Sequence, residues 1–122
     1  MRIGEALDAM RDLPEFLEVG LDSIHTVGNM GNTPLHIAAR WNDPELVALL
    51  ASAGAEINAS GEEGTTPLHA AAENGALEAA VRLLDLGADP SALDDHGMTP
   101  LCTARVLKCR ALVDLLERAA GR

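Results

Sequence analysis

Apolar side chains recur along this chain in short runs that have the 3.6-residue spacing of one helix face, and glycine, proline or polar residues separate the runs. The clearest run follows the Thr-Pro pair at 33–34, where Leu35 and the alanines after it fall on a single face. Runs of similar composition follow the Thr-Pro pairs at 66–67 and 99–100. The pattern therefore predicts short helices whose small side chains let a neighbouring helix approach closely.

The stretches that contain these runs are copies of one another. Residues 31–39 (GNTPLHIAA), 64–72 (GTTPLHAAA) and 97–105 (GMTPLCTAR) align without gaps, and each copy begins 33 residues after the one before it. A fixed period of this length is typical of stacked supersecondary units, because a single unit cannot bury its apolar face alone. We therefore expect a solenoid rather than one closed globule.

Each repeat also contains signals for the ends of helices. A threonine hydroxyl before proline can accept a hydrogen bond from a first-turn amide, and proline at the first helical position lacks only an N–H that would have no partner there. The Asp-Pro pair at 43–44 gives the same signal for a second helix, and Gly54 and Gly87 follow helices at positions where a left-handed cap favours glycine. Both helices of a repeat are shorter than the ~12–15 residues at which an isolated helix becomes marginal, so each repeat depends on its neighbours.

The shared motif Thr-Pro-Leu-His-x-Ala at a period of 33 residues resembles the ankyrin repeat. The resemblance implies an all-α solenoid of stacked helix-turn-helix units with protruding β-turn fingers. It also implies that His36 and His69 hydrogen-bond threonine hydroxyl and backbone groups of adjoining loops, instead of serving as catalytic bases or metal ligands. Cys102 replaces the histidine in the third copy, so we expect that tie to be absent there.

Family repeats often place aspartate three residues before the motif glycine. Only Asp94 fits this pattern, since Gly28 and Gly61 occupy the position in the earlier copies. We therefore expect the two earlier fingers to be the more mobile ones.

The length of 122 residues predicts a single domain. Ile3, Leu7 and Met10 have the spacing of a first helix in the leading segment, and residues 13–17 suggest a truncated second helix. The predicted organisation of domain 1–122 is a degenerate N-terminal capping repeat at 1–30, repeats at 31–63 and 64–96, and a C-terminal capping repeat at 97–122.

Charge is unevenly distributed along the chain. Residues 1–96 carry 17 acids and four bases, whereas residues 97–122 carry two acids and five bases, within a total net charge of −10. The acidic part is expected to repel polyanions and attract a basic partner, although surface acids that only maintain solubility are an alternative. Two aromatic residues and no basic groove argue against binding to nucleic acid.

Other sequence features indicate where the protein is found. No segment resembles a secretory signal or approaches the ~20 apolar residues of a membrane span, so we expect a cytoplasmic protein that does not contact membranes. Cys102 and Cys109 would lie ~10.5 Å apart along one continuous helix, beyond disulfide reach, so buried free thiols are expected unless a turn brings them together. Eight arginines against one lysine suggest a GC-rich, and hence bacterial, source.

In the ankyrin family a partner usually binds the concave face, which the finger tips and the exposed side of the first helix form. Trp41 draws attention because tryptophan is enriched among interface hot spots, but it can also fold over the core of its own repeat. Val106 and Leu107 would extend an adaptable apolar strip beside it. By motif offset, the resemblance places these contact candidates on that face: Met30, Asn32, Arg40, Trp41, Glu62, Glu63, Thr65, Glu73, Asn74, Asp95, His96 and Met98.

Catalysis has little support in the sequence. No serine or cysteine has the context of a nucleophile, and the glycines stand singly at caps and turns instead of forming a phosphate-binding loop. Residues 94–96 (DDH) have metal-ligating side chains but are also typical turn residues. We expect no enzymatic activity, no metal and no cofactor.

These observations favour a non-enzymatic protein–protein interaction module that binds a protein with a basic surface through its acidic concave face and fingers. A small bacterial ankyrin protein is similar to immunity proteins or accessory proteins of a neighbouring gene product. The alternative is a structural protein that self-associates near Val106 and Leu107 or through its terminal repeats, although we expect a monomer.

Overall fold

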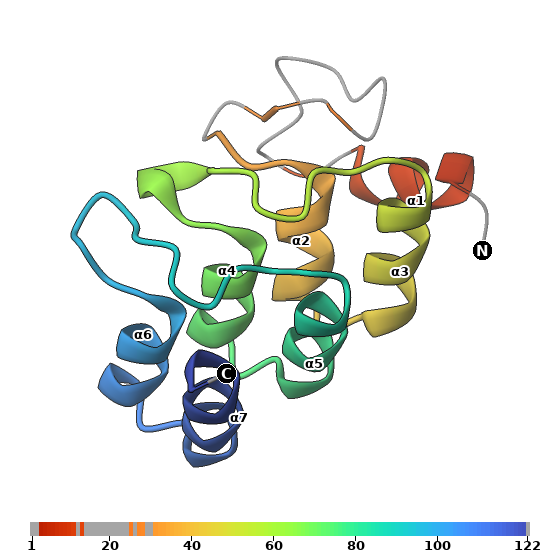
Figure 1. The fold of residues 1–122 in the computed structure, drawn as a ribbon. Helices are drawn as coiled ribbons and strands as arrows, with labels where there is room; N and C mark the ends of the chain where they lie inside the picture. Colours follow the sequence, from red (N-terminus) through yellow and green to blue (C-terminus); the bar gives the residue numbers. More distant parts are fainter. Residues whose placement is uncertain (1–2, 12, 14–24, 26, 29–30, 122) are drawn as a thin grey trace.

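The computed structural model describes residues 3–11, 13, 25, 27–28 and 31–121 (Figure 1). The described residues form no β-strand and the following α-helices: α1 (Ile3–Met10), α2 (Pro34–Arg40), α3 (Pro44–Ser52), α4 (Pro67–Glu73), α5 (Leu77–Asp85), α6 (Pro100–Val106) and α7 (Arg110–Ala120). A one-turn 3-10 helix, η1 (Glu62–Gly64), lies in the loop between α3 and α4.

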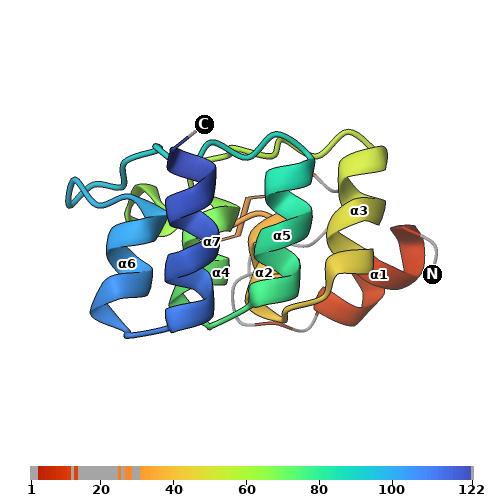
Figure 2. The same cartoon turned by 60° about the horizontal axis from the view of Figure 1, so that its bottom comes forward.

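The helices form two layers. Figure 2 shows α3, α5 and α7 side by side in one layer, with α2, α4 and α6 in the layer behind. Within each layer every helix packs against the next, α2 on α4 and α4 on α6, and α3 on α5 and α5 on α7. The long loops after α3 and α5 project from the same end of the helix pairs (Figure 1). The predicted all-α solenoid of stacked helix pairs with protruding loops is confirmed.

The helix starts are those that the sequence predicts. Thr33, Thr66 and Thr99 are the N-cap residues of α2, α4 and α6, and proline follows each of them. The Thr66 and Thr99 hydroxyls accept hydrogen bonds from first-turn amides at 3.3 and 3.2 Å. In α3 the Asp43 carboxylate accepts from the amide of Leu46 at 3.1 Å.

The turn between the two helices of each repeat uses a left-handed residue at the same position. Asn42, Gly75 and Lys108 lie one period apart and have φ of 54°, 65° and 59°. Asparagine and glycine adopt this conformation readily, whereas lysine does so at a cost. Gly54 and Gly87, with φ of 104° and 97°, end α3 and α5 in the left-handed conformation that the sequence predicts.

The core is continuous along the stack. The motif leucines Leu35 and Leu68 are fully buried, while Leu101 is half-buried because α6 lies at one end of the stack. The largest buried aliphatic side chains come from every helix except α6: Met10, Leu35, Ile37, Val47, Leu50, Leu68, Leu83, Leu112 and Leu116. Each repeat thus shelters the apolar face of the next.

Helix α1 covers the opposite end of the stack by packing against α2 and α3. Its apolar stripe is as predicted, with Leu7 and Met10 buried and Ile3 half-buried. The second helix expected at 13–17 lies outside the described residues, apart from Leu13. No helix in the described part of the chain is long and apolar enough to cross a bilayer.

Candidate functional site

The two motif histidines tie adjacent repeats together. His36 Nδ1 accepts a hydrogen bond from the Thr33 amide at 3.1 Å and lies 2.9 Å from the Thr33 hydroxyl, while Nε2 donates to the carbonyl oxygen of Thr65 at 2.8 Å. His69 repeats the arrangement with Thr66 and with the carbonyl oxygen of Met98, again at 2.8 Å. The histidine roles implied by the ankyrin resemblance are confirmed.

The third copy lacks this tie, as expected. Cys102 stands in the place of the histidine, and its sulfur accepts a hydrogen bond from the Thr99 hydroxyl at 3.3 Å, which lowers the pKa of the thiol. Cys102 and Cys109 are both free, as predicted, but each is only half-buried.

A backbone hydrogen bond closes each finger in the same way. The amides of Gly28, Gly61 and Asp94 donate to carbonyl oxygens four residues later at 2.8, 2.7 and 3.0 Å. The Asp94 carboxylate also accepts from the amides of His96 and Met98 at 2.9 and 3.0 Å, and these bonds hold its pKa below the usual value. The three fingers therefore share this closing hydrogen bond although only the third has the family aspartate.

Gly61 stands where family repeats often have aspartate, and its lack of a side chain has a packing reason. A Cβ at this position would overlap Asn32 Oδ1 and lie 2.6 Å from His36 Nε2. The space is occupied because Asn32 Oδ1 accepts from the amide of Glu62 at 3.0 Å, which joins the first finger to the second. The glycine thus permits two side chains of one repeat to grip the next finger.

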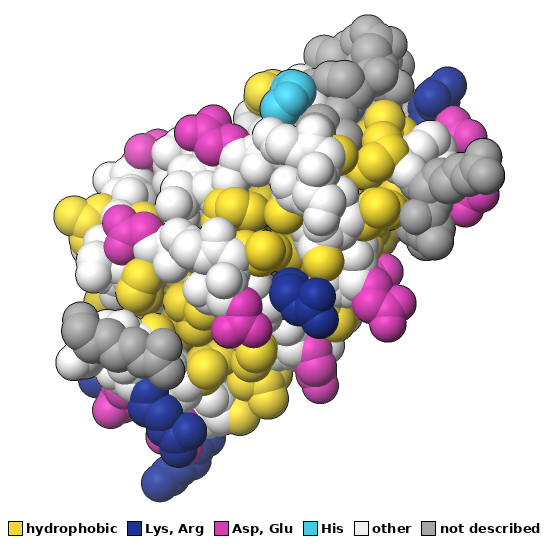
Figure 3. Space-filling model, turned by 45° about the vertical axis from the view of Figure 1, so that its right-hand side comes forward, with side chains coloured by type: hydrophobic (Ala, Val, Ile, Leu, Met, Phe, Trp, Pro, Cys, Tyr) yellow, Lys and Arg dark blue, Asp and Glu magenta, His cyan; other side chains and the backbone are white. Residues whose placement is uncertain are grey.

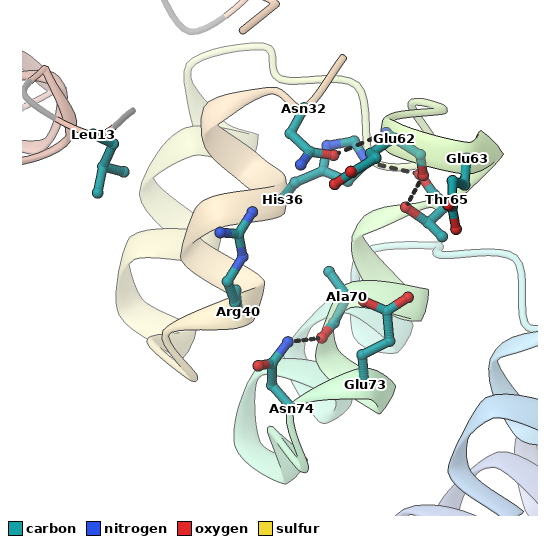
Figure 4. Close-up of a pocket in the computed structure, with 10 residues that line it drawn as sticks. All are labelled: Leu13, Asn32, His36, Arg40, Glu62, Glu63, Thr65, Ala70, Glu73 and Asn74. Atoms are coloured by element: carbon teal, nitrogen blue, oxygen red, sulfur yellow. Dashed lines mark hydrogen bonds between the residues drawn. The ribbon is translucent and has the colours of Figure 1, made fainter. Parts of the chain in front are cut away.

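These ties hold the second finger over a cleft between α2 and α4. Its volume is about 690 Å³, and its lining also includes Leu13 and Ala70. Figure 4 shows Arg40 on the α2 side, Glu73 and Asn74 on the α4 side, and Glu62 and Glu63 on the finger at the upper end.

The cleft carries more acidic than basic side chains. Burial raises the pKa of the Glu73 carboxyl, and the nearby Asp94 and Glu62 carboxylates raise it further, while His69 and Arg40 act in the opposite direction. Glu73 makes no hydrogen bond or ion pair with any described residue. A cation that entered the cleft would therefore find a carboxylate with unused acceptor capacity.

The structure brings together most of the contact candidates that the sequence predicts. Glu63, Asp95 and His96 are exposed on adjoining fingers, where the Asp95 amide donates to the Glu63 carbonyl oxygen at 2.9 Å and His96 Nε2 lies 3.3 Å from the Glu63 carboxylate. Met30 lies outside the described residues. Seven candidates line the cleft: Asn32, Arg40, Glu62, Glu63, Thr65, Glu73 and Asn74.

The predicted exposure of two candidates is wrong. Asn32 and Thr65 are only 5 % and 9 % exposed, because their polar groups are used in hydrogen bonds within the second finger and between it and the preceding repeat. Asn32 bonds the Glu62 amide, and Thr65 donates its hydroxyl to the Glu62 carbonyl oxygen at 2.7 Å while its own carbonyl receives His36. They hold the finger in place and offer little surface to a partner.

Trp41 and Met98 occupy intermediate positions. Trp41 is 43 % exposed at the C-cap of α2 and does not line the cleft, so most of its surface is covered while the rest faces solvent. Met98 is half-buried, and its backbone is fixed by Asp94 and His69.

Sequence reasoning missed Asn42. Its side chain accepts from the amide of Ala79 at 2.9 Å and donates to Glu78 at 2.8 Å, so it caps the first turn of α5 from the preceding repeat. The available signal was that Ala76, at the N-cap of α5, cannot cap the helix itself.

Among the described residues, no three His, Cys, Asp or Glu side chains are grouped so as to hold a metal ion. Residues 94–96 form a turn, in which the Asp94 carboxylate accepts hydrogen bonds from the amides of His96 and Met98.

The fold and the cleft define a class of protein, a solenoid of helix pairs whose loops are fixed by side-chain bonds between repeats. A family model described as ankyrin repeats in many copies matches residues 50–104, and one described as ankyrin repeat matches residues 30–62. The chain belongs to the ankyrin-repeat family. Ankyrin repeats generally mediate protein–protein interaction and are generally non-enzymatic. No curated protein matches the chain.

Proposed function

We propose that this protein is a non-enzymatic binding module that captures a protein partner in the cleft between α2 and α4 and along the adjoining fingers. The observation that carries the proposal is the cleft itself, about 690 Å³ in volume and bordered by exposed side chains on a rigidly tied finger. A solenoid presents such a face because its loops and inner helices repeat in register.

The charges favour a partner with a basic surface. Glu62, Glu63 and Glu73 line the cleft, Arg40 is its one basic side chain among the described lining residues, and Asp95 extends the acidic row to the next finger. Complementary charge speeds association and excludes wrong partners more than it adds affinity. The partner class we propose is a basic protein encoded beside this one, for which the module acts as an immunity or accessory protein in a bacterial cytoplasm.

The test is binding of the purified neighbouring gene product, measured by calorimetry, to the wild type and two double variants. Glu62→Lys/Glu73→Lys changes the cleft, whereas Glu45→Lys/Asp85→Lys makes the same charge change at exposed positions on α3 and α5 in the other layer. We expect the cleft variant to weaken binding by about tenfold or more and the control to change it by less than about threefold.

Equal weakening by both variants would mean that net charge, not the cleft, governs the interaction. Failure of the neighbouring product to bind the wild type would remove the immunity or accessory role.

A further inference from the structure

The corner where α6 meets α7 exposes apolar side chains that the core does not use. Val106 and Leu107 are 68 % and 52 % exposed, although the positions one repeat earlier carry the polar residues Glu73 and Asn74. Exposed apolar side chains that are adjacent in space mark contact sites more often than single ones do. Lys108 follows them in the left-handed conformation, which places a cation beside the apolar pair.

This corner is also the basic end of an acidic molecule. Arg105, Lys108 and Arg110 are exposed there and border a depression of about 350 Å³. Asp114 and Glu117 also line it, and Glu117 lies 3.6 Å from Arg105, so the bases exceed the acids by one. Figure 3 shows several Lys and Arg side chains gathered at the lower left, with some acidic side chains beside them, whereas on the rest of the visible face acidic side chains are more frequent than basic ones. Five bases and two acids in residues 97–122 contrast with 17 acids and four bases in residues 1–96.

The cleft between α2 and α4 is the complement of this corner on the same chain. Its apolar lining residues are Leu13, which is half-buried, and Ala70, which is 7 % exposed. Glu62, Glu63 and Glu73 add carboxylates, against the single guanidinium of Arg40. The carboxylate of Glu73 makes no hydrogen bond or ion pair with a described residue, so it can receive the ammonium group of Lys108 from another molecule.

We propose that the α6–α7 corner of one molecule docks into the cleft of a second copy, with Val106 and Leu107 against the apolar surface and Lys108 beside Glu73. The inference rests on the proposed function only in that both use the cleft, and it requires no external partner. Because the corner and the cleft are different surfaces, the contact is head-to-tail and leaves a free corner and a free cleft at the ends of a dimer. A second copy therefore competes with the partner protein for the cleft, and short open chains form as the concentration rises.

The test uses two variants that each remove one half of the contact. Leu107→Glu prevents docking by the corner and leaves the cleft intact. Glu73→Lys prevents docking into the cleft and leaves the corner intact. In sedimentation velocity at physiological ionic strength, we expect the sedimentation coefficient of the wild type to rise with concentration and each variant alone to stay monomeric. A mixture of the two variants should form a 1:1 dimer and nothing larger, because only one productive corner–cleft pair remains.

Matched controls change the same chemistry elsewhere. Leu93→Glu alters a leucine that is 64 % exposed on the loop before α6, and Glu45→Lys alters an exposed carboxylate on α3; both should associate like the wild type. A wild type that is monomeric at every concentration, or association that survives in both single variants, would overturn the inference. Neither result affects the proposed function, because Leu107→Glu leaves the cleft available for the partner-binding measurement.

Discussion

A single imidazole, that of His36, connects three parts of the structure. It closes the N-terminus of α2 through Thr33, bonds the next finger through Thr65 and lies beside the surface of the cleft. All of these contacts require a neutral ring, with Nδ1 as acceptor and Nε2 as donor. The protonation state of one side chain therefore bears on the stability of the contact between two repeats.

We expect the free energy of unfolding to fall as the pH drops below about 6.5, the ordinary histidine pKa. Burial, the largest cause, lowers the pKa of His36 in the folded state, so the unfolded chain binds the proton first on acidification. The contribution of His36 to the free energy of unfolding is fully present above its pKa in the unfolded chain. It is lost once the pH is below its pKa in the folded protein. Urea unfolding at about pH 7.5 and about pH 5.5 measures the difference.

The control is His36→Gln, which keeps an amide at this position but cannot titrate in that range. The wild type should lose more stability than this variant between the two pH values, since the carboxylates that also titrate are common to both proteins. Parallel losses would contradict a role for His36 in the pH dependence.

At the level of the helix, the first turn of each outer-layer helix shows how the repeats support one another. Asp43 is the N-cap residue of α3 and bonds a first-turn amide of that same helix. Asn42 belongs to the preceding repeat and bonds a first-turn amide of α5. The position equivalent to Asn42 before α7 is Gly75, which has no side chain, and Cys109 at the N-cap of α7 makes no side-chain hydrogen bond. One cap in the series is therefore missing.

Gly75→Asn should restore that cap and stabilise the protein by about 0.5–1 kcal/mol. The nearest atom to an added Cβ is Cys109 Sγ at 3.9 Å, so the side chain has room. The left-handed φ of 65°, close to the 54° of Asn42, costs asparagine less than it costs most other residues with a Cβ. The new side chain would accept from the amide of Leu112, one period after Ala79. The midpoint of denaturant unfolding measures the gain.

Gly75→Ala is the matched control, because it adds a side chain without an acceptor and should destabilise by about 1 kcal/mol in the left-handed conformation. If the asparagine and alanine variants unfold at the same midpoint, the capping argument is wrong.

The sequence was sufficient to predict the helix starts, the burial of the motif leucines and the histidine bonds. These features depend on residues a few positions apart or on a motif that repeats with a constant period. Asn42 and Gly61 could not be assigned in the same way, because their roles depend on which side chain of one repeat lies beside which backbone atom of the next. The packing of the helices sets how adjacent repeats are placed relative to each other, and the sequence of one repeat does not show this placement.

The wrong prediction of exposure for Asn32 and Thr65 has a similar cause. Motif offset placed both on fingers, which is correct, but neither side chain faces solvent. Asn32 turns toward the neighbouring finger, and the Thr65 hydroxyl bonds the Glu62 carbonyl oxygen of its own finger. A polar residue on a loop has two ways to satisfy its hydrogen bonds, and only the structure shows which partner is nearer.

At the level of the whole molecule, stability depends on contacts between adjacent repeats rather than on one closed core. Leu68 of α4 and Leu83 of α5 are fully buried in the middle helix pair, which has a neighbouring pair on each side. Replacing either with alanine should cost ~2–5 kcal/mol, a large share of the ~5–15 kcal/mol that stabilises a small domain.

Leu93→Ala is the control for this prediction, since an exposed leucine should cost less than ~0.5 kcal/mol. Thermal or denaturant unfolding compares the three variants with the wild type. If alanine at Leu68 or Leu83 lowers the free energy of unfolding as little as alanine at Leu93, the central helix pair does not stabilise the stack as proposed.

The histidines hold the fingers by main-chain oxygens, those of Thr65 and Met98, and this choice of atoms has a consequence for diversification. Every residue type supplies the same carbonyl, so amino acids at neighbouring tip positions such as 62, 95 and 96 can be exchanged without altering these bonds. Position 63 is more restricted, because Glu63 has a φ of 55°. The scaffold is thereby suited to combinatorial libraries in which the tips are randomised while the imidazoles keep the frame constant.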